Sequence, residues 1–588
     1  MKDDPPGLAD ELRRVEAIRA IKRLQHSHAH FVMAHRWRDV ADLFAREGVL
    51  MRGDTVIKGR ATIQAYLQRE RGPLRYGRLL VELVMSPVVT LAPDGRHGKA
   101  RWHELTIDAV VGDYADWAGG IQENDYLFED GEWKIARLRY YPQFAGPYLP
   151  GWRGLNENPQ LVPYHFTPSQ AGRPAASVEQ GSINATPDAL AGRVKRLEDE
   201  AAIQNLQNAW GYYVDRRLWD DVADLYAVDA TLCLARGVET GRGAIRAALE
   251  TMAPALLPDG ELNDHLLFAP VITIDPAGTT ATARGIVLGM IGVNDVDAQW
   301  TVAIYDNDYV ECDGVWMIAA SRLYPRAATD YYRGWAESQL ADHPSWQLAT
   351  NRPDDRFPNV AMPDICFTPL SGAPQCDNVQ GLARRIAAAA AKDAIENIAC
   401  AYGYYIDEFR WHETAALFSE RGWKELSYIG TYIGRDRVLG SLIARYGDKG
   451  RVSPFLAIHQ KMQPVITVAP DALKARIHLR LFQIGALPSG PGPFIGGVYE
   501  NEAVLEDGVW KISGMDLDYI WFSGYAEGWG KVDPAVARQF APEPGAMDHY
   551  PPDGPLRGPV FSPFPAQETL PFHFRNPVSG RAPPRLLD

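Results

Sequence analysis

YYIDEFRW, residues 404–411, is one of three related stretches in this sequence; the others are YYVDRRLW at 212–219 and HFVMAHRW at 30–37. The final tryptophan is present in all three. The acidic residue four positions before it is Asp407 in one copy, Asp215 in another, and is replaced by Met33 in the first. The tryptophan therefore marks a repeated element, and the carboxylate marks a difference between the copies.

Three tryptophan landmarks show that most of the chain is repeated. Each recurs at spacings of 182 to 194 residues. The three sets are Trp37, Trp219 and Trp411; Trp133, Trp316 and Trp510; and Trp152, Trp335 and Trp529. This period is far longer than that of a solenoid, so each copy is predicted to be a complete domain. The predicted domains are 8–155, 189–340 and 381–532, and proline-rich segments at 156–188, 341–380 and 533–588 follow them.

Composition limits the possible functions. The chain has 588 residues, a net charge of −14 and a pI near 5.5, and no dense Lys/Arg cluster, which argues against nucleic acid as a partner. The first residues, MKDDPPGLADELRR, lack the basic start and apolar run of a signal peptide, and no stretch reaches the ~20 apolar residues of a membrane helix. Five cysteines without a CxxC pair indicate neither a zinc site nor a disulfide framework. We expect a cytoplasmic protein with no membrane partner.

Each copy is predicted to begin with helices and to end in a sheet. Apolar residues recur at helical spacing in VKRLEDEAAIQNLQNAWGYYVD (194–215), and shorter amphipathic stretches follow the tryptophan and a Gly-Arg turn. The remainder is strand-like, and its last two strands meet at EDGEWKI, CDGVWMI or EDGVWKI, where Asp-Gly favours a tight hairpin. We therefore predict an α+β fold of three cone-shaped domains, each with helices packed on a curved, mostly antiparallel sheet able to hold a small ligand.

The proline-rich segments carry aromatic residues beside proline. They read VPYHFTP, MPDICFTP and, near the end of the chain, LPFHF. Flexible linkers are rich in Gly and Ser and poor in aromatics, so we expect these segments to be extended arms that lie across a neighbouring domain.

The helix order, the DxxxW element and the DGVWKI hairpin resemble the SnoaL-like branch of the nuclear-transport-factor-2-like superfamily. The resemblance covers about 130 residues of each copy, and the third copy is most similar to the scytalone dehydratases. That superfamily includes dehydratases, isomerases, cyclases, hydrolases, formaldehyde-releasing lyases and binding proteins, so the fold alone does not give the function. The dehydratases are trimers of single domains, which suggests that three fused copies form an intramolecular pseudo-trimer, either monomeric or assembled further into a homo-oligomer.

The resemblance implies catalytic residues for each copy. Alignment on a shared proline and on Ala-Arg pairs gives the third copy a complete set, Asp407, His459 and His478. The second copy has Asp215 and His265 but Ile286 at the third position, and the first copy has only His103, with Met33 and Glu82 at the others. Tyr428, near a family tyrosine that polarises the substrate carbonyl, completes the catalytic set. The candidate substrate-binding residues are Tyr432, Tyr499, Asn501 and Trp411, and Tyr305 joins the second-copy candidates. The sequence departs from the dehydratase pattern in that the pocket asparagine is shifted by two positions and Ile406 replaces a tyrosine.

These residue types suit acid–base chemistry. Histidine exchanges protons near neutral pH, a carboxylate orients an imidazole, and tyrosine hydroxyls stabilise an enolate. We expect a cofactor-independent lyase of the dehydratase type, acting on a small apolar or aromatic oxygenated substrate. A formaldehyde-releasing lyase or a ketosteroid-type isomerase would use the same residues, and a non-catalytic binding protein is the alternative from another class. No metal site is expected, because no carboxylate or cysteine is spaced to complete a site with the histidines of HSHAH (26–30).

Overall fold

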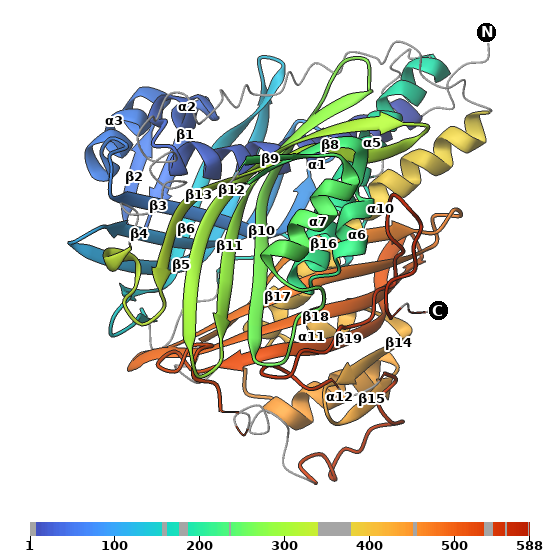
Figure 1. The fold of residues 1–588 in the computed structure, drawn as a ribbon. Helices are drawn as coiled ribbons and strands as arrows, with labels where there is room; N and C mark the ends of the chain where they lie inside the picture. The colour runs from blue at the N-terminus through green and yellow to red at the C-terminus, as the bar shows by residue number, and fades with distance from the viewer. Residues whose placement is uncertain are drawn as a thin grey trace.

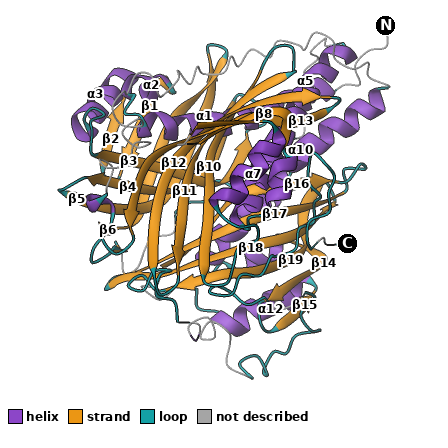
Figure 2. Ribbon diagram, viewed as in Figure 1, coloured by secondary structure: helices purple, strands orange, loops and turns teal. Residues whose placement is uncertain are grey.

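The computed structural model describes residues 7–155, 162–175, 186–234, 237–338, 378–450, 456–533, 535, 545–558, 561–585 and 587. Three curved sheets make up most of the molecule, and the long helices of the three domains contact one another (Figures 1 and 2). The three domains share one α+β topology, so the fold predicted from the repeats is confirmed.

The first domain contains ten helices and strands within the described residues. They are α1 (Leu8–Met33), α2 (Trp37–Asp42), β1 (Phe44–Arg52), β2 (Thr55–Lys58), α3 (Arg60–Arg71), β3 (Arg78–Leu91), β4 (His97–Val110), β5 (Tyr114–Glu129), β6 (Glu132–Pro147) and β7 (Arg153–Gly154). The sheet order is β2-β1-β6-β5-β4-β3, antiparallel except for the parallel pair β1 and β6.

The other two domains repeat this plan. After α4 (Pro168–Ala171), the second domain has α5 (Pro187–Asp215), α6 (Trp219–Asp224), β8 (Tyr226–Leu234), β9 (Gly237–Thr240), α7 (Arg242–Met252), β10 (Glu261–Ile274), β11 (Thr280–Val293), β12 (Asp297–Cys312), β13 (Val315–Asp330) and the 3₁₀ turn η1 (Trp335–Glu337). The third has α10 (Val379–Asp407), α11 (Trp411–Ala416), β14 (Phe418–Leu426), β15 (Gly430–Ile433), α12 (Arg435–Tyr446), β16 (Leu456–Val468), β17 (Lys474–Leu487), β18 (Gly490–Glu506) and β19 (Val509–Ser523).

Local sequence explains the tight hairpins that close each sheet. Asp130, Asp313 and Asp507 have φ values of 52°, 53° and 50°, and the glycine after each is also left-handed. Two successive positive φ values define the hairpin turn that Asp-Gly favours, as the sequence predicted. One feature was not predicted: a short hairpin, β1–β2 in the first domain, lies between the second and third helices of every copy, so the helices do not form one uninterrupted block.

The three domains pack around an approximate threefold axis. The strands β3, β10 and β16 contact one another there, and each has a β-bulge at the same position. The bulged residues Ser86, Ala269 and Gln463 all have positive φ, between 49° and 59°. These equivalent backbone features place the same face of each domain at the axis, so the chain is an intramolecular pseudo-trimer.

The Gly-Trp landmarks join each domain to the next. The indole of Trp152 in the first domain donates to the carbonyl of Gly485 in the third, at 2.9 Å. Trp529 of the third domain donates to Ile291 of the second, at 2.8 Å. In the second domain the residue after Trp335 accepts a bond from the first-domain Gly112, at 2.7 Å. The contacts run around the ring in one direction.

Two of the proline-rich arms lie across sheet surfaces. In the first arm, Tyr164 donates to the carbonyl of Tyr404 in α10 (2.9 Å), and His165 pairs with Glu123 in β5 (2.8 Å). In the C-terminal arm, His573 pairs with Glu500 in β18 at 2.8 Å, and the adjacent Phe572 and Phe574 pack on α5. Most of the arm predicted at 341–380 lies outside the described residues, which begin again at residue 378.

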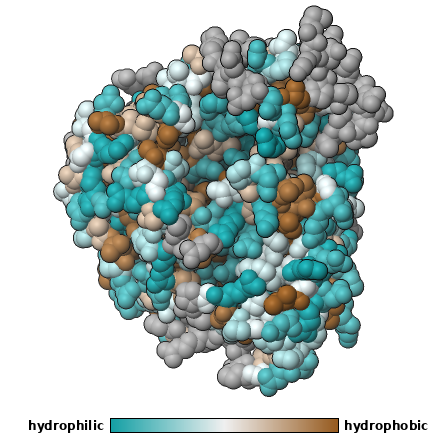
Figure 3. All heavy atoms as spheres, turned by 90° about the vertical axis from the view of Figure 1, so that its right-hand side faces the viewer, coloured by the Kyte–Doolittle hydropathy of each residue, from teal (hydrophilic) through white to brown (hydrophobic). Residues whose placement is uncertain are grey.

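The surface is mostly hydrophilic on the face shown in Figure 3, where apolar residues form small separated patches. No helix in the described part of the chain is long and apolar enough to cross a membrane.

Candidate functional site

The repeated tryptophan is a structural anchor. The indole N–H of Trp411 donates to the carbonyl of Gly447 at the end of α12, at 2.8 Å. Trp37 and Trp219 make the same bond to Gly72 and Ala253, at 2.7 and 2.8 Å. A bond present in all three domains explains why the tryptophan persists while the preceding carboxylate does not.

Asp407 and His459 form a close pair in the third domain. Asp407 ends α10 and His459 lies in β16. One carboxylate oxygen of Asp407 accepts the backbone N–H of His459 at 2.9 Å, and the other hydrogen-bonds to Nδ1 of its ring. The side chains are 8% and 17% exposed. No partner for Nε2 of His459 occurs among the described residues, so this nitrogen is available for proton transfer.

His459 faces the inside of the third domain together with Lys461. Residues two apart on a strand share a face. The Lys461 ammonium donates to the carbonyl of Ala399 in α10 (2.7 Å) and lies 4.5 Å from the ring centre of Tyr402 and 4.2 Å from that of Tyr499. Burial lowers the pKa of Lys461 to about 7. The inside of the third domain therefore holds an imidazole–carboxylate pair beside a buried amine.

The assignment of His478 to this site is corrected by the structure. Ile477 and Leu479 face the inner core of the domain, so His478 points to the opposite face of the sheet. The Ala-Arg alignment was also out of register by two residues. Three residues pair with equivalent valines just after the axial bulge; they are Arg101 with Val88, Arg284 with Val271, and His478 with Val465.

His478 belongs to an interface with the second domain and the C-terminal arm. Its Nδ1 bonds to Glu500 at 2.6 Å, and its ring lies 4.3 Å from Tyr212 and 5.2 Å from Phe572, centre to centre. Glu500 also accepts from His573 at 2.8 Å. Burial lowers the pKa of His478, and it is 1% exposed, so this ring tethers the arm and has no route to the inner face.

The predicted tyrosines and asparagine of the third-domain site occupy different environments. Tyr499 and Asn501 lie on β18, whose alternation gives them the same face. Both are buried, and neither polar side-chain atom of Asn501 has a partner in the described structure. Tyr428 stacks on Tyr519 with ring centres 6.3 Å apart. The hydroxyl of Tyr432 instead donates to the carbonyl of Tyr550 in the C-terminal arm, at 2.9 Å, which commits it to an arm contact.

The second domain has the same carboxylate–imidazole pair in a different setting. Asp215 accepts the backbone N–H and Nδ1 of His265, at 2.9 and 3.0 Å. Its second oxygen pairs with Arg480, which β17 of the third domain supplies. Tyr305, the remaining candidate, is buried over Gly285, and burial raises its pKa far above the ordinary range. This carboxylate is engaged by a neighbouring domain as well as by its histidine.

The first domain keeps an acid–imidazole pair made of other residues. Nδ1 of His28 in α1 bonds to Glu82 at 2.8 Å, and Arg52 lies 3.6 Å from the same carboxylate. Burial favours a raised pKa for Glu82, but His28 and Arg52 outweigh it and leave the pKa below its ordinary value. The predicted His103 lies outside this group, 4.3 Å from the ring of Tyr404 in the third domain. The other HSHAH histidines do not converge on one point, because His26 and His30 bond separate carbonyls.

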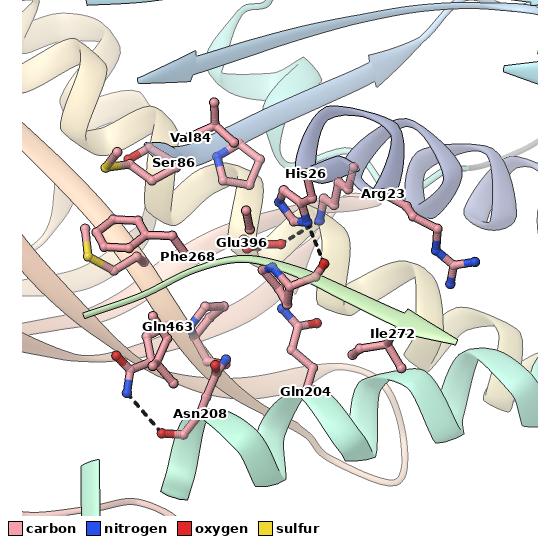
Figure 4. Close-up of a pocket in the computed structure, with 18 of the residues that line it drawn as sticks. Arg23, His26, Val84, Ser86, Gln204, Asn208, Phe268, Ile272, Glu396 and Gln463 are labelled. Carbon is pink, nitrogen blue, oxygen red and sulfur yellow. Dashed lines mark hydrogen bonds and ion pairs between the residues drawn. The ribbon is translucent and has the colours of Figure 1, made fainter. Parts of the chain in front are cut away.

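A small polar pocket, partly open to solvent, lies at the junction of the three domains (Figure 4). Its walls come from α1, α5 and the axial strands. Two ion pairs lie in its wall, Lys22 with Glu396 at 2.5 Å and Arg23 with Glu200 at 3.4 Å, and Lys461 also lines it. In Figure 4, dashed lines join the ring of His26 to the carbonyl of Pro270 and the amide of Gln463 to the carbonyl of Asn208. Neither Asp407 nor His459 lines this pocket, although Lys461, two residues from His459 on β16, does.

Two buried lysines of the third domain, Lys424 in β14 and Lys461 in β16, were not among the residues predicted for the site. A signal was available in the repeats. Where the third copy has these lysines, the first two have aliphatic residues, namely Leu50 and Leu232 for Lys424, and Val84 and Leu267 for Lys461. A charged residue at a core position that is apolar in the other two copies indicates that the interior of the third domain is more polar.

A model of the SnoaL-like domain matches residues 13–139, 195–322 and 387–516, about two thirds of the chain. The chain therefore belongs to the SnoaL-like family and contains three copies of its domain. No curated protein sequence matches it.

Several solved structures resemble one domain of this chain over about a fifth of its length. One is a putative scytalone dehydratase from Novosphingobium aromaticivorans (22% identity, 23% of this chain and 89% of that chain, TM-score 0.21). Another is a hexachlorocyclohexane dehydrochlorinase, LinA type 2 (22%, 23% and 91%, TM-score 0.22). ActVI-ORFA from Streptomyces coelicolor is similar over 20% of this chain and 91% of its own, at 14% identity and a TM-score of 0.18.

Proposed function

We propose that the third domain catalyses an acid–base elimination, a lyase reaction of the dehydratase type that needs no cofactor. The observation that carries the proposal is the Asp407–His459 pair, which leaves Nε2 of His459 without a partner among the described residues. A buried carboxylate bonded to Nδ1 fixes the imidazole tautomer and stabilises the imidazolium that forms when Nε2 accepts a proton.

The reaction divides between these groups in a simple way. Nε2 of His459 removes the proton next to a carbonyl, and the imidazolium then returns a proton to the departing hydroxyl, so water leaves and the imidazole is regenerated. The hydroxyls of Tyr428 and Tyr499 are the proposed donors to the enolate oxygen. The substrate is a small apolar or aromatic oxygenated compound, matching the aromatic rings of Tyr402 and Tyr499.

The test compares two matched histidines in the full-length chain. Mass spectrometry would follow a panel of aromatic β-hydroxy ketones for loss of water, with the wild type beside His459→Gln and His265→Gln. General acid–base catalysis contributes about 10²–10⁴-fold, so His459→Gln is expected to lower kcat by about that factor, whereas His265→Gln retains turnover. Turnover that is equally fast in His459→Gln would refute the proposal.

Two other readouts separate the alternatives. A loss of mass equal to that of formaldehyde would show that the enzyme is a formaldehyde-releasing lyase and not a dehydratase. Deuterium uptake from D₂O without any loss of mass would indicate an isomerase that uses the same pair. Binding without turnover or exchange would favour a binding domain and overturn the proposed chemistry.

A further inference from the structure

The third domain buries two lysines that form no close ion pair with a described residue, although Asp516 and Glu425 act on Lys424, and Asp407 on Lys461, from farther away. Lys424 is 5% exposed and Lys461 is 1% exposed. No carboxylate of the described residues lies within 4.0 Å of either ammonium nitrogen. A buried charge without a counterion costs several kcal/mol or loses its proton. Burial accordingly lowers the pKa of Lys424 to about 8 and that of Lys461 to about 7.

The contacts that hold these lysines leave donor capacity unused. Lys461 donates to the Ala399 carbonyl at 2.7 Å, and Lys424 donates to the Glu425 carbonyl at 3.2 Å. Both ammonium groups also face the ring of Tyr402, at 4.5 and 5.7 Å from its centre. An ammonium has three N–H donors. Each lysine therefore retains hydrogens that no described protein group accepts, and the shared ring places the two amines in one region.

The fold does not require lysine at either position. The equivalent residues in the other two domains are aliphatic and buried or nearly so: Leu50, Leu232, Val84 and Leu267. Those domains form the same sheet with the same register as the third. The cost of burying two amines thus needs an explanation other than stability.

The third domain has also lost side chains that fill the inside of the other two. In the second domain, Gln207 accepts from Asn307 (2.9 Å) and from Tyr309. In the first, Gln25 accepts from Asn124 (3.1 Å) and from Tyr126 (2.8 Å). The third domain keeps the asparagine as Asn501 but has Ala399 and Ala503 in place of the glutamine and tyrosine. The amide of Asn501 is left buried and unpaired.

We propose that Lys424, Lys461 and Asn501 recognise a carboxylate on the substrate of the third domain. A carboxylate accepts several hydrogen bonds and supplies the negative charge that the two amines lack. The rest of the substrate contacts the apolar and aromatic residues on the same inner face, such as Leu479 and Tyr499.

This inference names the substrate class for the site proposed above, and its catalytic meaning rests on that proposal. His459 lies two residues from Lys461 on the same strand face, so a bound carboxylate is close to the base. Removing a proton beside a carboxylate or conjugated carbonyl places further negative charge on oxygen. The two lysines, which a bound carboxylate holds in their charged form, stabilise that negative charge in a water-poor interior.

The test measures binding rather than turnover. Calorimetry on the full-length protein would compare benzoate with benzamide, a neutral probe of similar shape. Benzoate is expected to bind at least about tenfold more tightly than benzamide, and Lys461→Met and Lys424→Met should each weaken benzoate binding by about tenfold, the loss of one charge-assisted hydrogen bond. Lys58→Met, at an exposed lysine of the first domain, is the matched control and should leave affinity unchanged.

The two proposals fail in different ways. His459→Gln should retain benzoate affinity within about twofold, so loss of turnover with intact binding concerns only the elimination chemistry. Equal affinity for benzoate and benzamide, no benzoate binding, or benzoate binding indifferent to both lysine substitutions would each overturn the carboxylate site. Turnover of neutral substrates alone, with unchanged rates in Lys461→Met, would overturn it as well.

Discussion

The second and third domains contain the same histidine–aspartate pair, but their surroundings differ. Around Asp215 and His265, the second oxygen of the carboxylate is held by Arg480 of the next domain. Around Asp407 and His459, the carboxylate bonds only its histidine among the described residues, and buried amines stand nearby. The same motif therefore stands in two environments, and the groups that neighbour it make the difference between the two domains.

The difference follows from the ring of domains. Each sheet presents its outer face to the long helix of another domain, and one strand position faces the end of that helix. At this position the third domain has Arg480, which pairs with Asp215 of the second domain, the second domain has Ile286, and the first has His103, whose ring lies 4.3 Å from that of Tyr404 in the third domain. An arginine stands at this position in the third domain alone.

The largest expected effect comes from Arg480→Met. Arg480 pairs with Asp215 and lies 3.4 Å from Asp264, and both carboxylates are almost fully buried. Removing the arginine leaves two buried charges without their cation. The free energy of unfolding is expected to fall by about 3–5 kcal/mol, measured by chemical denaturation.

Two further variants sharpen this result. Ile286→Met, at the equivalent apolar position, should change the free energy of unfolding by less than about 1.5 kcal/mol. Adding Asp215→Asn to Arg480→Met should recover part of the loss, because one orphaned charge is removed. A loss in Arg480→Met no greater than that in Ile286→Met would contradict the interdomain ion pair.

The sequence predicted the architecture well because several independent signals agreed. Landmark spacing predicted three domains, the Asp-Gly turns predicted the closing hairpins, and the family resemblance, through the DxxxW element and the shared proline, assigned Asp407 and His459 to one site. His478 was misplaced because the Ala-Arg alignment was out of register by two residues, although strand alternation with Ile477 and Leu479 argued against the inner face. Contacts between domains, such as Arg480 with Asp215, depend on the packing of distant segments, and no pattern within one copy encodes them.

The second prediction concerns Lys461→Met. Lys461 has a folded pKa of about 7, below the ordinary 10.5, because burial outweighs the nearby Asp407 and Cys400 and because Lys424 adds like charge. Between these values the unfolded chain binds a proton that the folded chain does not. The contribution of this lysine to the free energy of unfolding therefore rises as the pH goes from about 7 to about 10.5. Below pH 7 the lysine lowers the free energy of unfolding by a constant amount.

Methionine removes that penalty. Lys461→Met is expected to raise the free energy of unfolding by about 1–4 kcal/mol at pH 7, with the gain shrinking toward pH 10. The difference between variant and wild type isolates this group from others that titrate in the range. Leu267→Met, the matched position in the second domain, should show no such pH dependence. A variant that is less stable than the wild type at pH 7 would mean that the lysine is compensated in the folded chain.

The smallest effect contrasts two equivalent asparagines. Asn307 donates to Gln207 at 2.9 Å and accepts the backbone N–H of Arg322 at 3.0 Å, whereas the amide of Asn501 has no partner in the described structure. Leucine in place of Asn307 leaves its partners unpaired, which costs about 1–3 kcal/mol. Leucine in place of Asn501 removes an unpaired buried amide, so the free energy of unfolding should rise by up to about 1 kcal/mol while benzoate affinity falls. Thermal denaturation of both variants measures the contrast, and equal destabilisation would show that Asn501 is satisfied within the protein and is not held for a ligand.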